Sequence, residues 1–190
     1  ARELARFINT TLSTPDGGLL HSYKAGGNPV NGYLEDYASV IQGYIKLYSI
    51  TPDPFWMDRA LHLTKHTLEN FSAPDIALLY FSSKQDRALI RRTVEVNDSV
   101  IPSSNSTMAK NLFLLGAFFA EPSFTERATS MVASLWDKME QYPGQYSNWM
   151  HLALWLQEPF YEVVLTGPEA FDTLDKFQTH YLPHTLLAAS

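Results

Sequence analysis

Residues 32–71, "GYLEDYASVIQGYIKLYSITPDPFWMDRALHLTKHTLENF", decide the fold because they read as two helices joined by a short turn. Over 33–49 the apolar side chains recur at intervals of three and four, the spacing of one helix face. The sequence "TPDP" (51–54) then interrupts this pattern. Asp53 can cap a new helix and Pro54 suits its first position, so a second helix is predicted over 55–71. Together they predict a helical hairpin.

The rest of the chain carries similar signals. Helices are predicted over 2–12, 105–119, 122–141 and 146–157, and a long loop with a short hairpin over 14–32. The segments "IALLYF" (76–81) and "ALIRRTVEV" (88–96) predict a β-hairpin near 76–96. A buried-type strand (161–167), a helix (168–182) and a possible strand (184–189) predict a small β-α-β unit. We therefore expect a mainly α fold, with a helical part over 1–158 and a β-α-β extension over 159–190 packed on it.

The loop lengths alternate. Long polar loops precede the helices at 33 and 105, whereas short turns precede those at 55 and 122. In successive antiparallel helices every second connection lies at the same end, so both long loops should lie on one face. This layout predicts a toroid of helical hairpins, of which the six helices would form about half.

Because "ARELARFINTTL" (1–12) reads as a helix already in progress, we expect a fragment of a longer protein. Its apolar edges should make it self-associate.

The composition narrows the possible functions. The net charge is −6 and Lys and Arg do not cluster apart from Arg91 and Arg92, which argues against a nucleic-acid surface. No apolar run reaches the length of a membrane span, and we expect a cytoplasmic protein. The absence of cysteine excludes disulfides and thiolate zinc sites. His62 and His66 lie one helical turn apart but lack an HExxH motif, so neither a metal nor a cofactor is expected.

Three acids are candidate catalytic residues. Glu35 and Asp36 open the helix at 33, where acids also stabilise a helix through its dipole. The two side chains point about 100° apart, so one can face a cleft while the other faces solvent. Asp98 lies in the polar stretch "RRTVEVNDSVIPSSNS" (91–106), where it can act in a reaction or serve as a turn or capping residue.

The same stretch supplies candidate binding residues. Arg92 can hold a carboxylate or a sugar hydroxyl, and Glu95 adds a second acid beside Asp98. Ser103 or Asn105 can cap the following helix, whose backbone N–H groups can bind polar ligand atoms. Since a cap needs one such residue and the stretch has four, we expect a binding wall as well as a cap.

Four further residues complete the candidate site. His21 and Tyr23 lie in the first long loop, and a histidine there can act as acid or base, although an exposed loop residue is the simpler interpretation. Tyr33 and Trp149 lie near the starts of predicted helices, where aromatic rings can stack on sugars. Their spacing equally fits the core.

Four blocks carry a resemblance to a known family: "GYLEDYASVIQGYIKLY" (32–48), "WMDRALHL" (56–63), "VEVNDSVIPSSNSTMAKNLFLLG" (94–116) and "YEVVLTG" (161–167). They resemble the C-terminal region of the YyaL-type thioredoxin-domain proteins, a family that includes spermatogenesis-associated protein 20. The resemblance implies a thioredoxin-like domain upstream and an (α/α)6 barrel of the six-hairpin glycosidase type, similar to N-acylglucosamine 2-epimerases. The matching positions are Glu35, Asp36, Arg92, Glu95, Asp98, Pro102, Ser103, Asn105 and Ser106. The chain departs from the family pattern at Val94 and Asn97, and it has no glycine in "FSAPDIALLYF" (71–81).

Two functional hypotheses follow. The first is a carbohydrate-active barrel that acts on a sugar-like molecule. A hydrolase would pair Glu35 or Asp36 with Asp98 across the scissile bond, whereas an epimerase or isomerase would use His21, or less convincingly His151, as a base. The second is a non-catalytic scaffold that binds a glycan or a protein and accompanies a redox domain.

Overall fold

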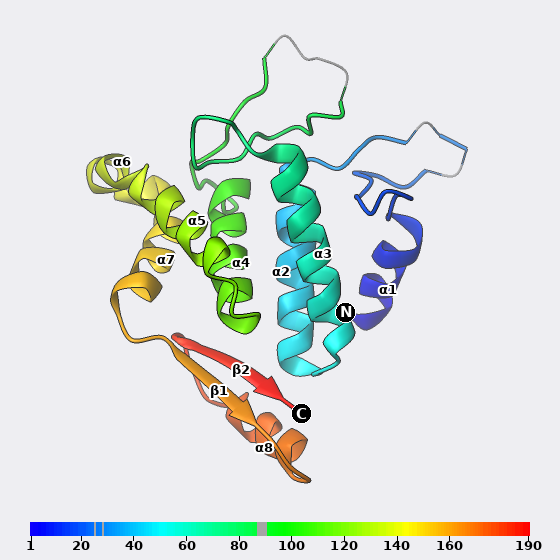
Figure 1. Ribbon diagram of the computed structural model, residues 1–190, viewed down its shortest axis with the longest axis vertical. Helices are drawn as coiled ribbons and strands as arrows, with labels where there is room; N and C mark the ends of the chain where they lie inside the picture. The colour runs from blue at the N-terminus through cyan, green and yellow to red at the C-terminus, as the bar shows by residue number, and fades with distance from the viewer. Residues whose placement is uncertain (25, 28, 87–90) are drawn as a thin grey trace.

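The computed structural model describes residues 1–24, 26–27, 29–86 and 91–190, which form a mainly helical structure (Figure 1). Its elements in chain order are α1 (Arg2–Thr11), α2 (Leu34–Ile50), α3 (Pro54–Phe71), α4 (Ser104–Phe118), α5 (Pro122–Ala133), α6 (Trp136–Gln141), the 3-10 turn η1 (Pro143–Gln145), α7 (Ser147–Gln157), β1 (Tyr161–Leu165), α8 (Ala170–Phe177) and β2 (Thr185–Ala189).

Two helical hairpins form the centre of the molecule. α2 packs on α3, α4 packs on α5, and α2 and α4 lie side by side between their partners. The Asn111 amide of α4 donates a hydrogen bond to the Ala38 carbonyl of α2 over 2.8 Å. The core between them consists of fully buried apolar side chains, among them Leu34, Ile41, Leu63, Met108, Leu112 and Leu115. Burial of these predicted helix faces is the main force that holds the hairpins together.

The helix starts follow the sequence signals. The Asp53 carboxylate accepts the Phe55 N–H at 3.1 Å, and Pro54 occupies the first helical position of α3 as predicted. The predicted helix over 122–141 is wrong in one respect, because the chain breaks into α5 and α6. At the break the Ser134 hydroxyl donates to the Met131 carbonyl at 2.7 Å and so competes with helix continuation.

The β-hairpin predicted near 76–96 is wrong for residues 76–86 and 91–96, which contain no strand. Residues 87–90 of this prediction lie outside the described part of the chain. The Leu79 backbone pairs with a side chain instead of a strand: Asn105 accepts its N–H at 2.8 Å and donates to its carbonyl at 2.9 Å. Arg127 of α5 donates to the carbonyls of Ala77 and Leu78. Side chains from α4 and α5 therefore satisfy the backbone groups of residues 77–79, and the Phe81 N–H donates to the Thr93 carbonyl at 2.8 Å without forming a strand pair.

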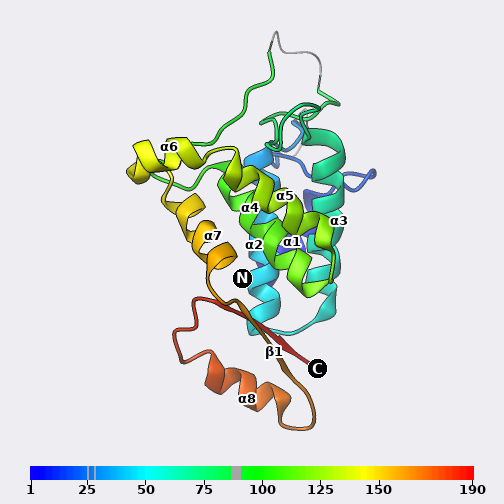
Figure 2. The same ribbon diagram turned by 60° about the vertical axis from the view of Figure 1, so that its left-hand side comes forward.

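The predicted C-terminal β-α-β unit is confirmed. β1 and β2 pair in parallel, with Tyr161 opposite Thr185 and Leu165 opposite Ala189. Contrary to the buried-type strand predicted, β1 has no fully buried residue. The unit lies at the end of the helical body where α2 ends (Figure 2). Two hydrogen bonds fix it there, from Trp155 Nε1 to the Pro183 carbonyl and from Gln178 Nε2 to the Ser49 carbonyl.

The alternation of long and short connections places the polar segments at one end. In Figure 1 the N-termini of α2, α4 and α7 all point to the upper end of the molecule, together with the described parts of 13–33 and 72–103. We call this end the loop face. It brings the polar stretch 91–106 to the same end as the start of α2, as the loop lengths predict.

Substitution of Asn105 tests how the segment around Leu79 is held. Asn105→Ala removes three hydrogen bonds and leaves the buried backbone of Leu79 without its partner, so we expect a loss of about 2 to 3 kcal/mol in the free energy of unfolding. Urea denaturation measures this loss. Asn31→Ala, at an exposed asparagine with one surface hydrogen bond, is the matched control and should cost less than about 1 kcal/mol. Equal losses in both variants would contradict the conclusion that Asn105 holds the Leu79 backbone in place.

Candidate functional site

Asp98 lies in the segment 72–103 at the loop face and is 7% exposed. Its Oδ1 accepts the Ser103 N–H at 2.9 Å and the Ser106 hydroxyl at 2.7 Å, and its Oδ2 accepts the Asn148 N–H at 2.8 Å. One carboxylate therefore caps α7 and also holds the N-cap residue of α4. Three donors from the protein already occupy the two oxygens of the strongest catalytic candidate. Its catalytic role stays a prediction.

The remaining candidates of the stretch 91–106 bind the chain itself. Glu95 Oε2 accepts the Ser104 hydroxyl at 3.0 Å at the start of α4. Ser103 is the N-cap of α4, where its hydroxyl accepts the Ser106 N–H and donates to the Val96 carbonyl. Asn105 is fully buried and holds the Leu79 backbone. More polar residues of this stretch bind the protein itself than the sequence predicts. Some cap α4, and others hold the loop that precedes it.

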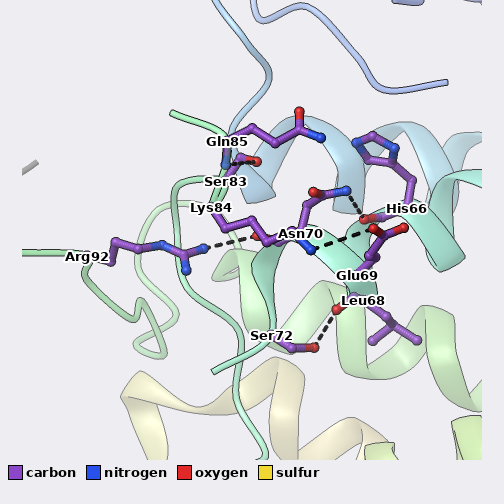
Figure 3. A network of polar contacts seen from close by, with 9 residues as sticks. All are labelled: His66, Leu68, Glu69, Asn70, Ser72, Ser83, Lys84, Gln85 and Arg92. Atoms are coloured by element: carbon purple, nitrogen blue, oxygen red, sulfur yellow. Dashed lines mark hydrogen bonds and ion pairs between the residues drawn. The ribbon is translucent and has the colours of Figure 1, made fainter. Parts of the chain in front are cut away.

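Arg92 closes the C-terminal end of α3 (Figure 3). Its guanidinium donates to the Asn70 carbonyl and to the Ser82 carbonyl, and it lies 4.2 Å from the centre of the Tyr80 ring. The Lys84 N–H shares the Asn70 carbonyl. Figure 3 shows Arg92 and Lys84 beside Asn70 in the last turn of α3, where carbonyls lack helical partners. Arg92 therefore binds backbone carbonyls in this structure, and the carboxylate or sugar partner stays a prediction.

The aromatic candidates separate into buried and exposed residues. Trp149 is fully buried in the core, and its Nε1 donates to the Val96 carbonyl at 2.8 Å, so its ring offers no open face for a sugar. Tyr23 is 60% exposed and meets Phe7 edge to face. Tyr33 is half-buried, stacked on Phe81 with ring centres 5.1 Å apart.

The structure brings His21, Tyr33 and Asp36 together although 15 residues separate His21 from Asp36. The Asp36 Oδ2 accepts the Tyr33 N–H at the start of α2 and lies 2.9 Å from His21 Nδ1. The His21 and Tyr33 rings are 5.0 Å apart. His21 remains 40% exposed and Asp36 23% exposed. The hydrogen bond with Asp36, its charge and that of nearby Glu35 raise the pKa of His21. This pair is a solvent-accessible acid–base group on the loop face.

A second polar cluster, which the sequence analysis missed except for His151, lies between α4 and α7. Lys110 Nζ donates to Asn148 Oδ1 and to His151 Nδ1, each at 3.0 Å, and lies 4.8 Å from the centre of the Trp155 ring. The Asn148 amide continues the chain of hydrogen bonds to the Ser106 hydroxyl at 2.9 Å. The signal in the sequence is a lone lysine inside the apolar helix 105–119.

The described residues hold no group of three potential metal ligands. His66 stacks on Tyr37 with ring centres 5.5 Å apart, and burial lowers its pKa. No helix in the described part of the chain combines the length and the apolar character that a membrane crossing requires.

Asp98→Asn tests whether the carboxylate links the starts of α4 and α7. An amide offers one acceptor oxygen in place of two and turns N–H donors toward other donors, so we expect a loss of about 2 to 4 kcal/mol in the free energy of unfolding. Urea denaturation measures it. Asp58→Asn on the exposed surface of α3 is the control, and a comparable loss there would contradict the capping role.

The charge state of His21 provides another test. Its raised pKa means that the protonated form stabilises the fold; this contribution is complete below pH 6.5 and disappears as the pH rises through the folded pKa. His21→Gln should therefore destabilise the protein more below pH 6.5 than in alkaline buffer. NMR titration should place the pKa of His21 above 6.5, and Asp36→Asn should return it toward that value. An unchanged pKa in Asp36→Asn would refute the pair.

Comparison with known proteins relates this chain to three mammalian proteins of one name, and that name states no activity. No family model matches the chain. It is 26% identical to human spermatogenesis-associated protein 20 over 188 residues, which cover 96% of this chain and 23% of the relative. The mouse protein of that name is 27% identical over 164 residues and the rat protein 26% over 165, each covering 84% of this chain and 21% of the relative. The chain thus spans less than a quarter of these relatives, and the similarity supports the family resemblance seen in its sequence blocks.

Proposed function

We propose that this chain contributes the loop face of a carbohydrate-active helical domain, with His21 and Asp36 as its acid–base pair. The observation that carries the proposal is the 2.9 Å contact between His21 Nδ1 and Asp36 Oδ2, in a pair that stays open to solvent. Glu35 adds negative charge beside it and Tyr33 adds an aromatic ring. A histidine held by a carboxylate is suited to move a proton at a carbon next to a sugar carbonyl.

The occupied oxygens of Asp98 favour proton transfer over hydrolysis. A two-carboxylate hydrolase needs one acid to protonate the leaving group and another to attack or to activate water. Asp98 accepts three hydrogen bonds from the protein, so it is better suited to position α4 and α7 than to exchange protons. An epimerase or isomerase reaction at His21 is therefore the preferred class, and Glu35 is the second candidate base.

The proposal includes a larger assembly. The paired hairpins α2–α3 and α4–α5, with long connections at one end, would serve in this proposal as repeating units of an (α/α)6 toroid. The relatives are more than four times longer than the matched region, which leaves room for the remaining hairpins and for an upstream thioredoxin-like domain. We propose that those hairpins supply the opposite wall of the cleft.

A non-catalytic scaffold is the second candidate function. It is favoured by the contacts of Arg92, Glu95, Ser103 and Asn105, which all bind the chain itself. In this case the loop face would be a rigid frame that holds a glycan or a protein partner beside the redox domain.

Deuterium exchange distinguishes the two candidates. The full-length protein is incubated with a panel of monosaccharides and disaccharides in D2O, and NMR follows exchange of carbon-bound hydrogens and the appearance of new reducing ends. We expect exchange without cleavage, lowered about 100-fold or more by His21→Gln and by Asp36→Asn. Asp58→Asn on α3 should leave it unchanged. Cleavage that depends on Asp98 would favour the hydrolase. Binding of a sugar without exchange, unaffected by both His21 and Asp36 variants, would favour the scaffold.

A further inference from the structure

A groove of about 500 Å³ lies at the end of the helical body opposite the loop face. The last turns of α2, the middle of α7 and the segment 177–187 of the β-α-β unit form its walls. Leu114, Trp155, Phe177 and Leu186 contribute apolar surface to it. Its size falls in the range of about 300 to 1,000 Å³ that is usual for small-molecule sites. We call it the cationic groove because Lys46, His151 and His180 line it.

The charges of the groove are opposite in sign to those of the chain. Acidic residues outnumber Lys and Arg by 20 to 14 in the whole sequence. The described residues that line the groove nevertheless include no Asp or Glu, and those that can carry positive charge are Lys46, His151 and His180. Neither of the two ion pairs found among the described residues, His21–Asp36 and Lys84–Glu69, involves them. No carboxylate in the described part of the chain therefore forms an ion pair with the cations that line this groove.

Lys110 adds a charge directly behind the groove. Burial and, to a lesser extent, nearby Lys46 lower its pKa against the opposing effect of Asp98, and the net result is a pKa of about 8. Burial also lowers the pKa of His151, helped by the positive charges of Lys110, His184 and Lys46. These mutual effects mean that the cations lie close enough to repel one another. An anion among them would relieve this repulsion and raise both pKa values.

The contact with Lys110 also fixes the tautomer of His151. An ammonium group has only donors, so His151 Nδ1 must accept the hydrogen bond from Lys110 Nζ. The ring proton of the neutral histidine then lies on Nε2. His151 consequently lines the groove as a hydrogen-bond donor even when it is uncharged. Lys110 acts through His151 in this arrangement and is a positioning residue.

We propose that the cationic groove binds a small organic anion, whose phosphate or carboxylate group contacts Lys46 and His151 and whose apolar part packs against Trp155. Trp155 is already held in place by its hydrogen bond to the Pro183 carbonyl. The ligand would therefore bridge α2, α7 and the β-α-β unit. This site is separate from the sugar-binding loop face and does not depend on it.

The direct test is calorimetric titration of the full-length protein with four probes at constant ionic strength. Phenyl phosphate and benzoate carry the two candidate anionic groups, benzyl alcohol is the neutral analogue, and inorganic phosphate lacks the apolar part. We expect saturable binding of at least one aromatic anion, and its identity distinguishes phosphate from carboxylate. Benzyl alcohol should bind at least about tenfold more weakly, since it cannot accept the charge-assisted hydrogen bonds. Equal binding of benzyl alcohol, or no binding of either aromatic anion, overturns the proposal.

Variants assign the binding to this groove. Lys46→Gln and His151→Gln should each weaken binding of the aromatic anion about tenfold. Lys65→Gln, an exposed lysine on α3, is the matched control and should leave binding unchanged. Lys46 is itself exposed, so its replacement should not unfold the protein. Unchanged affinity in both groove variants would place the ligand elsewhere and refute the proposal.

The protonation states give a readout that a purely structural role would not move. Affinity should fall as the pH rises through the pKa of Lys110, about 8, because the cluster loses charge. NMR should show the Nε2–H tautomer of neutral His151 in the free protein and a higher His151 pKa in the complex. Lys110→Met should abolish the tautomer preference, whereas Lys110→Arg should preserve it. An unchanged His151 pKa on saturation with the anion contradicts the assigned contact.

Discussion

The buried carboxylate of Asp98 is the interaction that joins the start of α4 to the start of α7, and the cluster of Lys110 and His151 lies between these two helices. The carboxylate oxygens accept the N–H groups of Ser103 and Asn148, and the backbone N–H of Asp98 donates to the Gln145 carbonyl at 2.7 Å. Helix N-termini expose N–H groups that must find acceptors when they are buried. Because the Asp98 carboxylate binds N–H groups at the starts of both helices, it fixes the start of α4 relative to the start of α7. Lys110 and His151, which face each other across these helices, meet as a consequence.

Periodicity predicts the helices well because their apolar faces are the faces that the fold buries. The helix over 33–49 buries Leu34, Ile41 and Tyr44 as its spacing requires. The β-hairpin near 76–96 shows where such reasoning fails. Alternating apolar residues indicate an extended chain, but they do not identify the partner of its backbone. Here Asn105 and Arg127, distant in sequence, take up the hydrogen bonds that the pattern assigned to a strand.

The candidate site illustrates the same limit for function. Loop lengths predict that the segment before α4 and the start of α2 lie at one end of the molecule, and the structure shows this arrangement (Figure 1). What a side chain binds depends on donors elsewhere in the chain, such as Asn148 for Asp98, which no local pattern reveals. The pairing of His21 with Asp36 is equally non-local. Conversely, a single lysine in an apolar helix looks unremarkable until the structure shows its histidine partner.

The position of Lys110 is costly for a purely structural residue. A methionine could fill similar space between α4 and α7 without the desolvation that depresses the lysine pKa. The carboxylate that opposes this depression, Asp98, is linked to Lys110 only through Ser106 and Asn148, and its oxygens are already shared among three donors. What the ammonium group provides in return is orientation: it holds the Asn148 amide and selects the tautomer of His151 at the wall of the groove. The contact with Asn148 links α4 to α7, and the contact with His151 leaves the second ring nitrogen as the donor that the proposed anion would meet in the groove.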